Sequence, residues 1–249
     1  MTGTGGSLEG RNGNLFLLGC MLFLMALVSA CSTARPVDTD LTGLRPDALL
    51  STLSANVEVS YRNGDTSGTV RGLMIYRRPD RFRVVLLSPF GSTLMEAALA
   101  GEELTLLYPS QQTAFRGNVG QLPLRTGLEA WKLLPWIFDL RQPREGSDSG
   151  SVVQHQPQPQ EETVRLNGGL VVEKRRTGGE LVRYAGYRNV GGVALAMEYE
   201  ITTADGSWVK LRLDEPEVNG ELADQAFSVT LQGVRILPLS LLRGEEQKN

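Results

Sequence analysis

Thiol and imidazole chemistry in this 249-residue chain is limited to two cysteines and one histidine. Cys20 lies inside a long apolar run and Cys31 closes it, so the chain after this run has no thiol for a disulfide or a thiolate site. His155 lies in the polar segment QHQPQPQ. Because a lone histidine cannot build a histidine-rich metal site or a Ser-His-Asp triad, we expect neither a metal centre nor a catalytic triad.

The charged side chains suggest no reaction either. Asp80, Asp139, Asp205 and Asp214 have no spacing that is typical of a paired acid and base. The formal net charge is -3 and no face rich in Lys and Arg could collect phosphates, so we expect no nucleic-acid partner. The short basic run 174–176 is interpreted as the solvated end of a strand. We therefore expect a protein that is not an enzyme and has no cofactor.

The apolar run before Cys31 has the length of a secretory signal. Leu15–Val28 fits a signal-peptide core of roughly 7–15 residues and is short for a membrane span of about 20. Small residues, Ser29 and Ala30, follow it, as a signal-peptidase site requires. We therefore predict that residues 1–30 are a signal peptide that is removed. An uncleaved signal anchor that happens to end in a cysteine is the alternative.

The residues Val28-Ser29-Ala30-Cys31 resemble the bacterial lipobox, in which an aliphatic and two small residues precede a cysteine. The resemblance implies that the Cys31 thiol receives diacylglycerol and that its new amino group is acylated. Each buried methylene contributes about 0.8 kcal/mol, so two or three chains would anchor the protein stably. Leu17–Cys20 fits the same pattern but would leave a second apolar run behind the anchor. Ser32 after the cysteine resembles an outer-membrane address.

Residues 31–47 comprise the lipidated cysteine and a polar stretch with two prolines, which indicates a flexible tether. Apolar and polar residues then alternate over 53–61, as in a half-buried strand, and Asn63-Gly64 suits a tight hairpin turn. Further strands are predicted at 66–77, 81–87, 93–99, 103–109 and 112–117. Turn residues separate them every eight to twelve residues or so, which favours an antiparallel meander.

One helix interrupts the strands. Leu128, Trp131, Leu134 and Phe138 recur close to a helical period, and Pro135 is expected to break or kink the helix near Leu134. Residues rich in Pro, Gln and Ser follow and are expected to form a mobile surface loop, 142–161. Strands resume at 163–166, 170–176, 181–187, 194–203 and 207–213, and a short turn and last strand end the domain, 48–242, before a frayed tail, 243–249. The fold class is mainly β, with about eleven strands.

The stretch YRRPDRFRVVLLSPFGSTLMEAAL, residues 76–99, carries a family resemblance. Its RPDRFR and SPFGST motifs resemble the outer-membrane lipoprotein receptors of the LolB family, within the LolA/LolB-like superfamily. The later order agrees: GEELTLLYPSQQTAF, the helical LEAWKLLPWIFDLR, YEITTADGSWVKLRL and the terminal LADQAFSV. The resemblance covers roughly residues 49–231.

The resemblance implies a strongly curved, unclosed antiparallel β-barrel with one or more helices plugging its mouth. It also implies that the protein accepts acylated lipoprotein cargo from a periplasmic, LolA-like carrier and inserts it in the bacterial outer membrane, on whose periplasmic face it is lipid-anchored. We expect a monomer. In the family an exposed leucine on a protruding loop helps delivery, and here Phe90, between Pro89 and Gly91, takes that place. The alternative is a loop aromatic that folds back onto the core.

A site for acyl chains needs volume, apolar walls and exclusion of water rather than catalytic groups. Our candidates for the cavity wall are Val57, Val59, Met74, Tyr76, Val84, Leu86, Leu106, Leu128, Trp131, Leu134, Met197 and Trp208. Each of them could instead be ordinary core packing.

Two other functions remain open at this point. The protein could be a structural or regulatory envelope lipoprotein that uses the same fold to bind a protein partner, and a filled interior would favour this. It could also be an enzyme acting on envelope lipids. Arg77, Arg78 and Arg81 could meet an acidic carrier or be plain solvated charge.

Overall fold

The computed structural model describes residues 48–123, 128–139, 149–154, 162–167 and 169–242, all within one compact unit. The predicted signal peptide, Cys31 with its tether, the tail and most of the predicted loop 142–161 lie outside the described residues.

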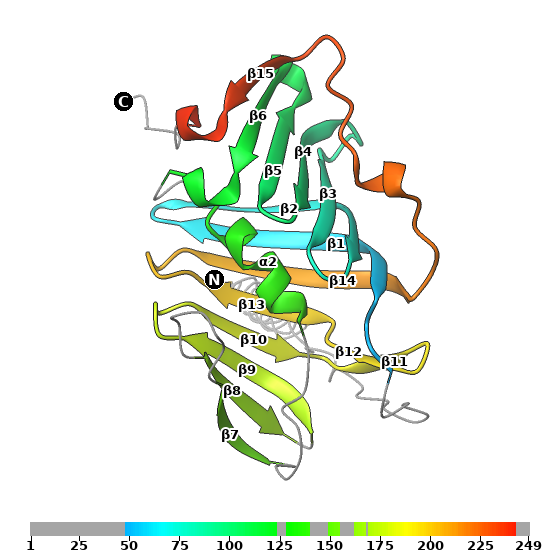
Figure 1. Ribbon diagram of the computed structural model, residues 1–249, viewed down its shortest axis with the longest axis vertical. Helices are drawn as coiled ribbons and strands as arrows, with labels where there is room; N and C mark the ends of the chain where they lie inside the picture. The colour runs from blue at the N-terminus through cyan, green and yellow to red at the C-terminus, as the bar shows by residue number, and fades with distance from the viewer. Residues whose placement is uncertain (1–47, 124–127, 140–148, 155–161, 168, 243–249) are drawn as a thin grey trace, which may run out of the picture. The chain divides into compact units, whose positions relative to one another are not determined.

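Six antiparallel strands form the first half of the sheet (Figure 1). They are β1 (Thr52–Asn63), β2 (Thr66–Arg77), β3 (Arg81–Leu87), β4 (Thr93–Ala100), β5 (Glu103–Tyr108) and β6 (Thr113–Asn118), with 3₁₀ turns η1 (Pro109–Gln111) and η2 (Val119–Gln121) around β6. Asn63 pairs with Thr66 across the predicted hairpin, where Gly64 takes a φ of 57°. The alternation along β1 and the turn residues between the later strands predicted all six strands closely.

The second half begins with α2 (Ala130–Phe138), the one α-helix among the described residues. The strands that follow are β7 (Ser149–Gln154), β8 (Glu162–Asn167), β9 (Leu170–Arg176), β10 (Leu181–Ala185), β11 (Arg188–Val190), β12 (Val193–Leu195), β13 (Glu198–Thr202) and β14 (Trp208–Val218). The chain ends in η3 (Asp224–Phe227), β15 (Arg235–Pro238) and η4 (Leu239–Leu241).

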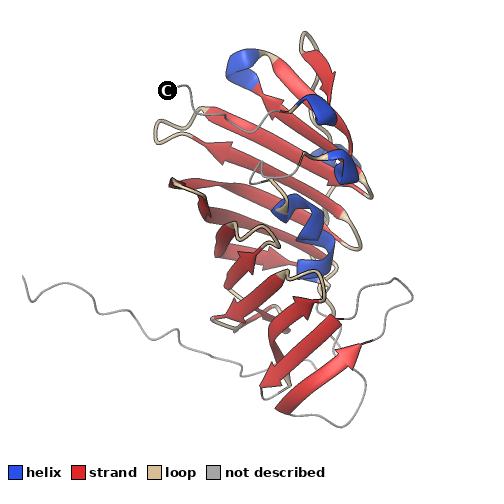
Figure 2. Ribbon diagram, turned by 90° about the vertical axis from the view of Figure 1, so that its left-hand side faces the viewer, coloured by secondary structure: helices blue, strands red, loops and turns tan. Residues whose placement is uncertain are grey.

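Thirteen strands make one open sheet in the order β15-β6-β5-β4-β3-β2-β1-β14-β13-β10-β9-β8-β7. All neighbours are antiparallel except β15 and β6, which are parallel. The first strand lies near the middle because β14 returns to pair with it along Leu53–Arg62. β15 and β7 are separate edges, and the sheet curves past α2 without closing (Figures 1 and 2). The predicted open, curved antiparallel sheet with a helix is confirmed.

Three local expectations were wrong. Residues 149–154, expected in a loop, form β7, because an edge strand needs backbone bonds to only one neighbour, here β8. The last strand expected within 221–231 is absent from the described structure, where η3 forms, and β15 pairs further along the chain with β6 instead. Pro135 does not end the helix: α2 runs on to Phe138, and the amide of Asp139 donates to the Pro135 carbonyl at 3.1 Å.

Gly72 is required where β2 approaches β3. A Cβ atom at this position would lie 2.1 Å from the carbonyl oxygen of Val85. We expect Gly72→Ala to lower the free energy of unfolding by about 1–3 kcal/mol, as overpacking does, measured by urea denaturation. Gly220→Ala is the control, because nothing lies within 4 Å of its Cβ position. Equal stabilities for the two variants would contradict this close approach.

Candidate functional site

The face of the sheet that α2 covers, called the inner face here, is lined by apolar side chains from successive strands (Figure 2). Cross-strand partners share a face, so Val57 of β1 and Leu213 of β14 lie side by side, as do Tyr76 of β2 and Phe82 of β3. All four are buried. The inner face is therefore one continuous apolar surface across β10, β13, β14 and β1–β5.

Helix α2 packs its apolar stripe onto the inner face. Leu133, Leu134, Ile137 and Phe138 are buried there. The Phe138 ring lies 5.2 Å from Tyr76, 5.4 Å from Phe82 and 5.0 Å from Tyr199, between ring centroids. Aromatic pairs at such distances contribute about 0.5–1.5 kcal/mol beyond the area they bury. The C-terminal half of α2 thus fills the middle of the inner face.

The end of α2 is also held by hydrogen bonds from the sheet. The Lys174 ammonium of β9 donates to the Trp136 carbonyl at 3.0 Å and to the Asp139 carbonyl. The Tyr184 hydroxyl of β10 donates to the Ile137 carbonyl at 2.9 Å. Carbonyls in the last turn of a helix lack partners within it, so these side chains supply them. A cation at this end also interacts favourably with the helix dipole.

Lys174 is buried, contrary to our interpretation of 174–176 as a solvated strand end. Its ammonium lies 3.7 Å from the Glu162 carboxylate of β8, and the two side chains are 5% and 6% exposed. Burial lowers the pKa of Lys174, and the charges of Glu162 and Asp139 oppose that shift. Arg176, on the same strand, places its guanidinium 4.4 Å from the centre of the Trp136 ring. The inner face thus contains a charged cluster that fixes α2.

One buried hydroxyl on the inner face has no hydrogen-bond partner among the described residues. It belongs to Tyr199, whose side chain is fully buried. Burial raises the pKa of this hydroxyl well above its usual value, so it stays neutral. A buried polar group without a partner costs about 1–3 kcal/mol.

We expect Tyr199→Phe to leave the free energy of unfolding unchanged or to raise it, because the variant removes an unsatisfied group. Tyr184→Phe is the matched control, since it loses the bond to Ile137 and should cost about 0.5–1.5 kcal/mol. Chemical denaturation of both variants checks this. If Tyr199→Phe lost as much stability as the control, the hydroxyl would have a partner in solution.

The predicted wall residues divide into three groups. Buried against the core are Val57, Met74, Tyr76, Val84, Leu106, Leu134 and Met197. Partly exposed but packed on the same core are Val59, Leu86, Leu128 and Trp131. Trp208 lies on the other face, because it pairs with Arg62, whereas its neighbour Val209 pairs with the inner-face residue Tyr61. The choice of Trp208 was wrong, since a shift of one residue in a strand reverses the face.

The inner face becomes more exposed toward the β1–β2 hairpin. Along β1, Leu53 is fully buried, Val59 is partly exposed and Tyr61 is 38% exposed. Leu86 and Met95, cross-strand partners at the neighbouring ends of β3 and β4, are also partly exposed. The apolar lining therefore reaches solvent at this end of the strands, where the turn 88–92 lies.

Pro89, Phe90 and Gly91 form the tip of that turn. The Gly91 amide donates to the Ser88 carbonyl at 2.9 Å, and the Ser88 and Ser92 hydroxyls lie 2.7 Å apart. Gly91 takes a φ of 83°, which favours glycine. Phe90 is 97% exposed, so its ring does not fold back onto the core. A closed, tight turn thus presents an apolar ring to solvent.

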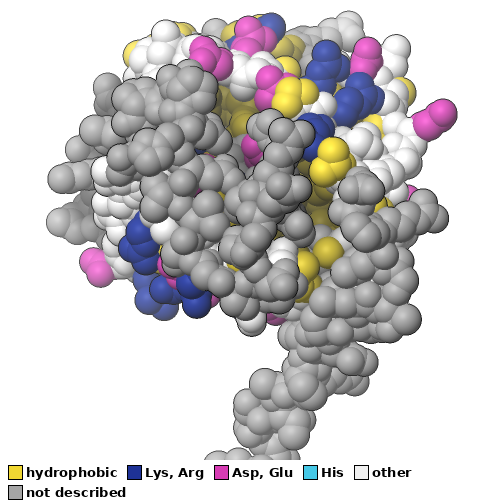
Figure 3. Space-filling model, turned by 60° about the horizontal axis from the view of Figure 1, so that its bottom comes forward, with side chains coloured by type: hydrophobic (Ala, Val, Ile, Leu, Met, Phe, Trp, Pro, Cys, Tyr) yellow, Lys and Arg dark blue, Asp and Glu magenta, His cyan; other side chains and the backbone are white. Residues whose placement is uncertain are grey.

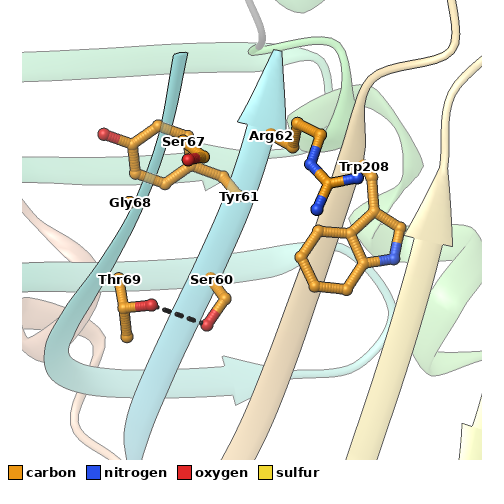
Figure 4. Close-up of a pocket in the computed structure, with 7 residues that line it drawn as sticks. All are labelled: Ser60, Tyr61, Arg62, Ser67, Gly68, Thr69 and Trp208. Carbon is orange, nitrogen blue, oxygen red and sulfur yellow. Dashed lines mark hydrogen bonds between the residues drawn. The ribbon is translucent and has the colours of Figure 1, made fainter. Parts of the chain in front are cut away.

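The described residues line two shallow hollows. One, of about 230 Å³, lies at the β1–β2 hairpin, where the Tyr61 ring crosses Gly68 and Arg62 points toward Trp208 (Figure 4). The other, of about 260 Å³, lies on the outer face beside Arg183 and Lys210. Neither is a deep apolar cavity under α2.

Charged groups on the described surface are mostly paired, and both signs are interspersed in Figure 3. Arg77 and Arg81 bind Asp224, and Arg78 lies 3.1 Å from Asp139. Within the described ranges, no group of His, Cys, Asp and Glu could hold a metal ion. The helix that the structure describes is too short to cross a membrane.

The match to a family model decides what kind of protein this is. Residues 51–215 match the model of the outer membrane lipoprotein LolB. The chain belongs to the LolB family. No curated protein is similar enough to match. The LolB-family match spans β1 to β14, and so includes the turn at Phe90, α2 and the charged cluster around Lys174.

Three solved structures are similar to this chain at low sequence identity. A DUF1329 family protein from Desulfovibrio piger is 10% identical, with a TM-score of 0.54 over 77% of this chain and 91% of its own. A LolA superfamily protein from Nitrosomonas europaea is 12% identical over 80% and 99%, with a TM-score of 0.45. A putative outer membrane lipoprotein-sorting protein domain from Vibrio parahaemolyticus is also 12% identical over 71% and 89%, with a TM-score of 0.46.

The residues that hold α2 were not predicted from the sequence. Lys174 pairs across the sheet with Val164 of β8 and Val182 of β10, and both valines are buried. The alternation in β8 and β10 therefore indicated that Lys174 is on the buried face. That signal is readable only once the pairing of the strands is known. In this structure Lys174 lies against the end of α2 rather than on the surface.

Proposed function

We propose that this protein is a lipoprotein receptor, lipid-anchored through Cys31 on the periplasmic face of the outer membrane. It accepts acylated lipoproteins from a LolA-like periplasmic carrier and inserts them in that membrane. Its LolB-family membership supports a role in lipoprotein sorting. The observation that carries the finer proposal is Phe90, an apolar ring held almost fully in solvent at the open end of the apolar inner face.

Cargo acyl chains enter from that end of the strands. The wall residues that remain partly exposed are Val59, Leu86, Leu128 and Trp131, so the first contacts form there. Deeper entry requires α2 to leave the inner face, and acyl chains then replace its apolar stripe. No chemical energy is needed, because the chains move to whichever site binds them more strongly.

Reconstitution tests this function. The full-length lipidated protein is placed in liposomes, and a carrier–lipoprotein complex is added. Cargo is expected to appear in the liposome fraction in proportion to the receptor, and empty liposomes are the control. Cargo that stays on the carrier at every receptor density would rule out the receptor function. Mass spectrometry of the first mature residue tests the anchor separately, and a bare thiol at Cys31 would contradict it.

The packing of α2 favours one other candidate. Because the helix fills the inner face, the fold could instead serve a structural or regulatory lipoprotein that binds a protein partner. Such a protein would bind no acyl chain at any concentration. Titration with a fluorescent fatty acid separates the two, since the receptor should bind it and lose it again to competing lipid.

A further inference from the structure

The outer face of β2–β4 carries an apolar patch that the proposed function does not use. It consists of Leu73, Val85, Leu87 and Leu94, called the outer patch here. Leu73 and Val85 are cross-strand partners. Leu94 is the extra residue of a β-bulge in β4, between Thr93, which pairs with Leu87, and Met95, which pairs with Leu86. Leu73 is 51% exposed and Leu94 is 47% exposed. Contiguous exposed apolar side chains of this kind mark interaction surfaces.

The C-terminal segment, which contains η3, leaves the outer patch uncovered. It crosses the outer face at the opposite ends of the same strands, where Arg77 and Arg81 bind Asp224. Farther along, Arg83 donates to the carbonyl of Ala226 at 2.8 Å. The segment thus covers the half of β2–β4 near the β2–β3 turn (Figure 1). The half near Phe90 stays open to solvent.

The outer patch is continuous with the turn that carries Phe90. Leu87 is the residue before that turn, and Leu94 lies three residues after Gly91. From Val84 to Met95 the chain contains no charged residue. One apolar surface therefore runs from the exposed ring at the tip onto the outer face of three strands.

Two ion pairs flank the outer patch. Glu58 and Glu96 are the nearest carboxylates on neighbouring outer-face positions, and each is paired, with Arg71 and Arg83 respectively. The Arg71 side chain is 83% exposed beside Leu87, where its charge can reach lipid phosphates while its stem lies along apolar surface. Because both arginines are paired with carboxylates, these two ion pairs add no net charge to the rim of the patch.

The position of the predicted lipid anchor also supports contact between the outer patch and a bilayer. The segment from Cys31 to Ala48, the first described residue, spans at most about 60 Å when it is fully extended. A domain tethered so close to a bilayer meets it at a high effective concentration, so a weak apolar contact suffices.

We propose that the outer patch rests on the outer membrane, so that β2–β4 lie against the bilayer with their outer face and Phe90 enters deeper beside them. This inference rests on the proposed membrane anchoring. It adds an orientation: the open end of the inner face is held at the membrane surface during delivery. Insertion of Phe90 alone would leave that orientation free.

Nitroxide labels on single cysteines test the orientation in the anchored protein. Leu73→Cys, Leu94→Cys and Phe90→Cys are made in the mature lipoprotein, whose Cys31 is acylated, and placed in liposomes of phosphatidylethanolamine and phosphatidylglycerol. Ile236→Cys is the matched control, because Ile236 of β15 has the same 51% exposure as Leu73. Collision rates with a water-soluble nickel complex should be several-fold lower at positions 73 and 94 than at position 236.

Equal collision rates at positions 73, 94 and 236 would overturn the inference. If position 90 is nevertheless protected, the proposed function survives that result, so the two failures are distinguishable. Spin–spin broadening between labels at position 73 would also overturn the inference, because it would show that a second copy covers the patch. Circular dichroism of each labelled protein confirms that it is folded.

Discussion

Phe90→Glu is expected to slow the delivery of cargo into liposomes by about tenfold or more, while loading from the carrier stays normal. Burying a phenylalanine contributes about 1.5–3 kcal/mol, and about 1.4 kcal/mol corresponds to a factor of ten. A carboxylate at the tip of the turn loses this contribution and resists entry into the interface. Because Phe90 is 97% exposed, its replacement should not disturb folding.

Two variants make the Phe90 result specific. Phe90→Leu keeps an apolar side chain and should deliver at close to the normal rate. Leu241→Glu places the same charge at another exposed apolar position, 57% exposed in η4, and should have no effect. Rates are measured as cargo recovered in floated liposomes. Normal delivery by Phe90→Glu would mean that Phe90 is an ordinary surface residue.

Lys174→Met is expected to lower the free energy of unfolding by about 3–5 kcal/mol, the usual cost of breaking a buried ion pair. Glu162 would keep a buried, uncompensated charge. The carbonyls of Trp136 and Asp139 would lose the ammonium that they accept from. The loss should therefore include a loosening of α2, visible as faster hydrogen exchange over Ala130–Phe138.

Two comparisons separate the effect of burial from the effect of charge. Lys210→Met breaks an exposed pair with Glu198, at 2.8 Å, and should cost at most about 1 kcal/mol. The double variant Lys174→Met, Glu162→Leu should recover much of the lost stability, because it leaves no unpaired buried charge. Urea denaturation gives all three values. A loss for Lys174→Met no larger than for Lys210→Met would show that the pair is solvated.

The alternation along β1 and the turn residues between the later strands predicted β1 to β6, because each strand is a hairpin neighbour of the next. The φ preferences of Asn63-Gly64 predicted this hairpin, but its turn residues are Gly64 and Asp65, because Asn63 ends β1 and pairs with Thr66. The SPFGST motif located the loop at Phe90. These features depend on residues close together in the sequence, so the sequence alone specifies them.

Other features depend on pairings between distant segments, and only the tertiary structure decided them. Lys174 is buried because β9 is placed next to β8 and beneath the end of α2, where helix carbonyls need donors. β15 is a strand because β6 offers it an edge from more than a hundred residues away in sequence. The outer patch stays exposed because the C-terminal segment crosses the strands at their other end. Non-local contacts of this kind leave no periodic trace in the chain, since each partner alone is compatible with several neighbours.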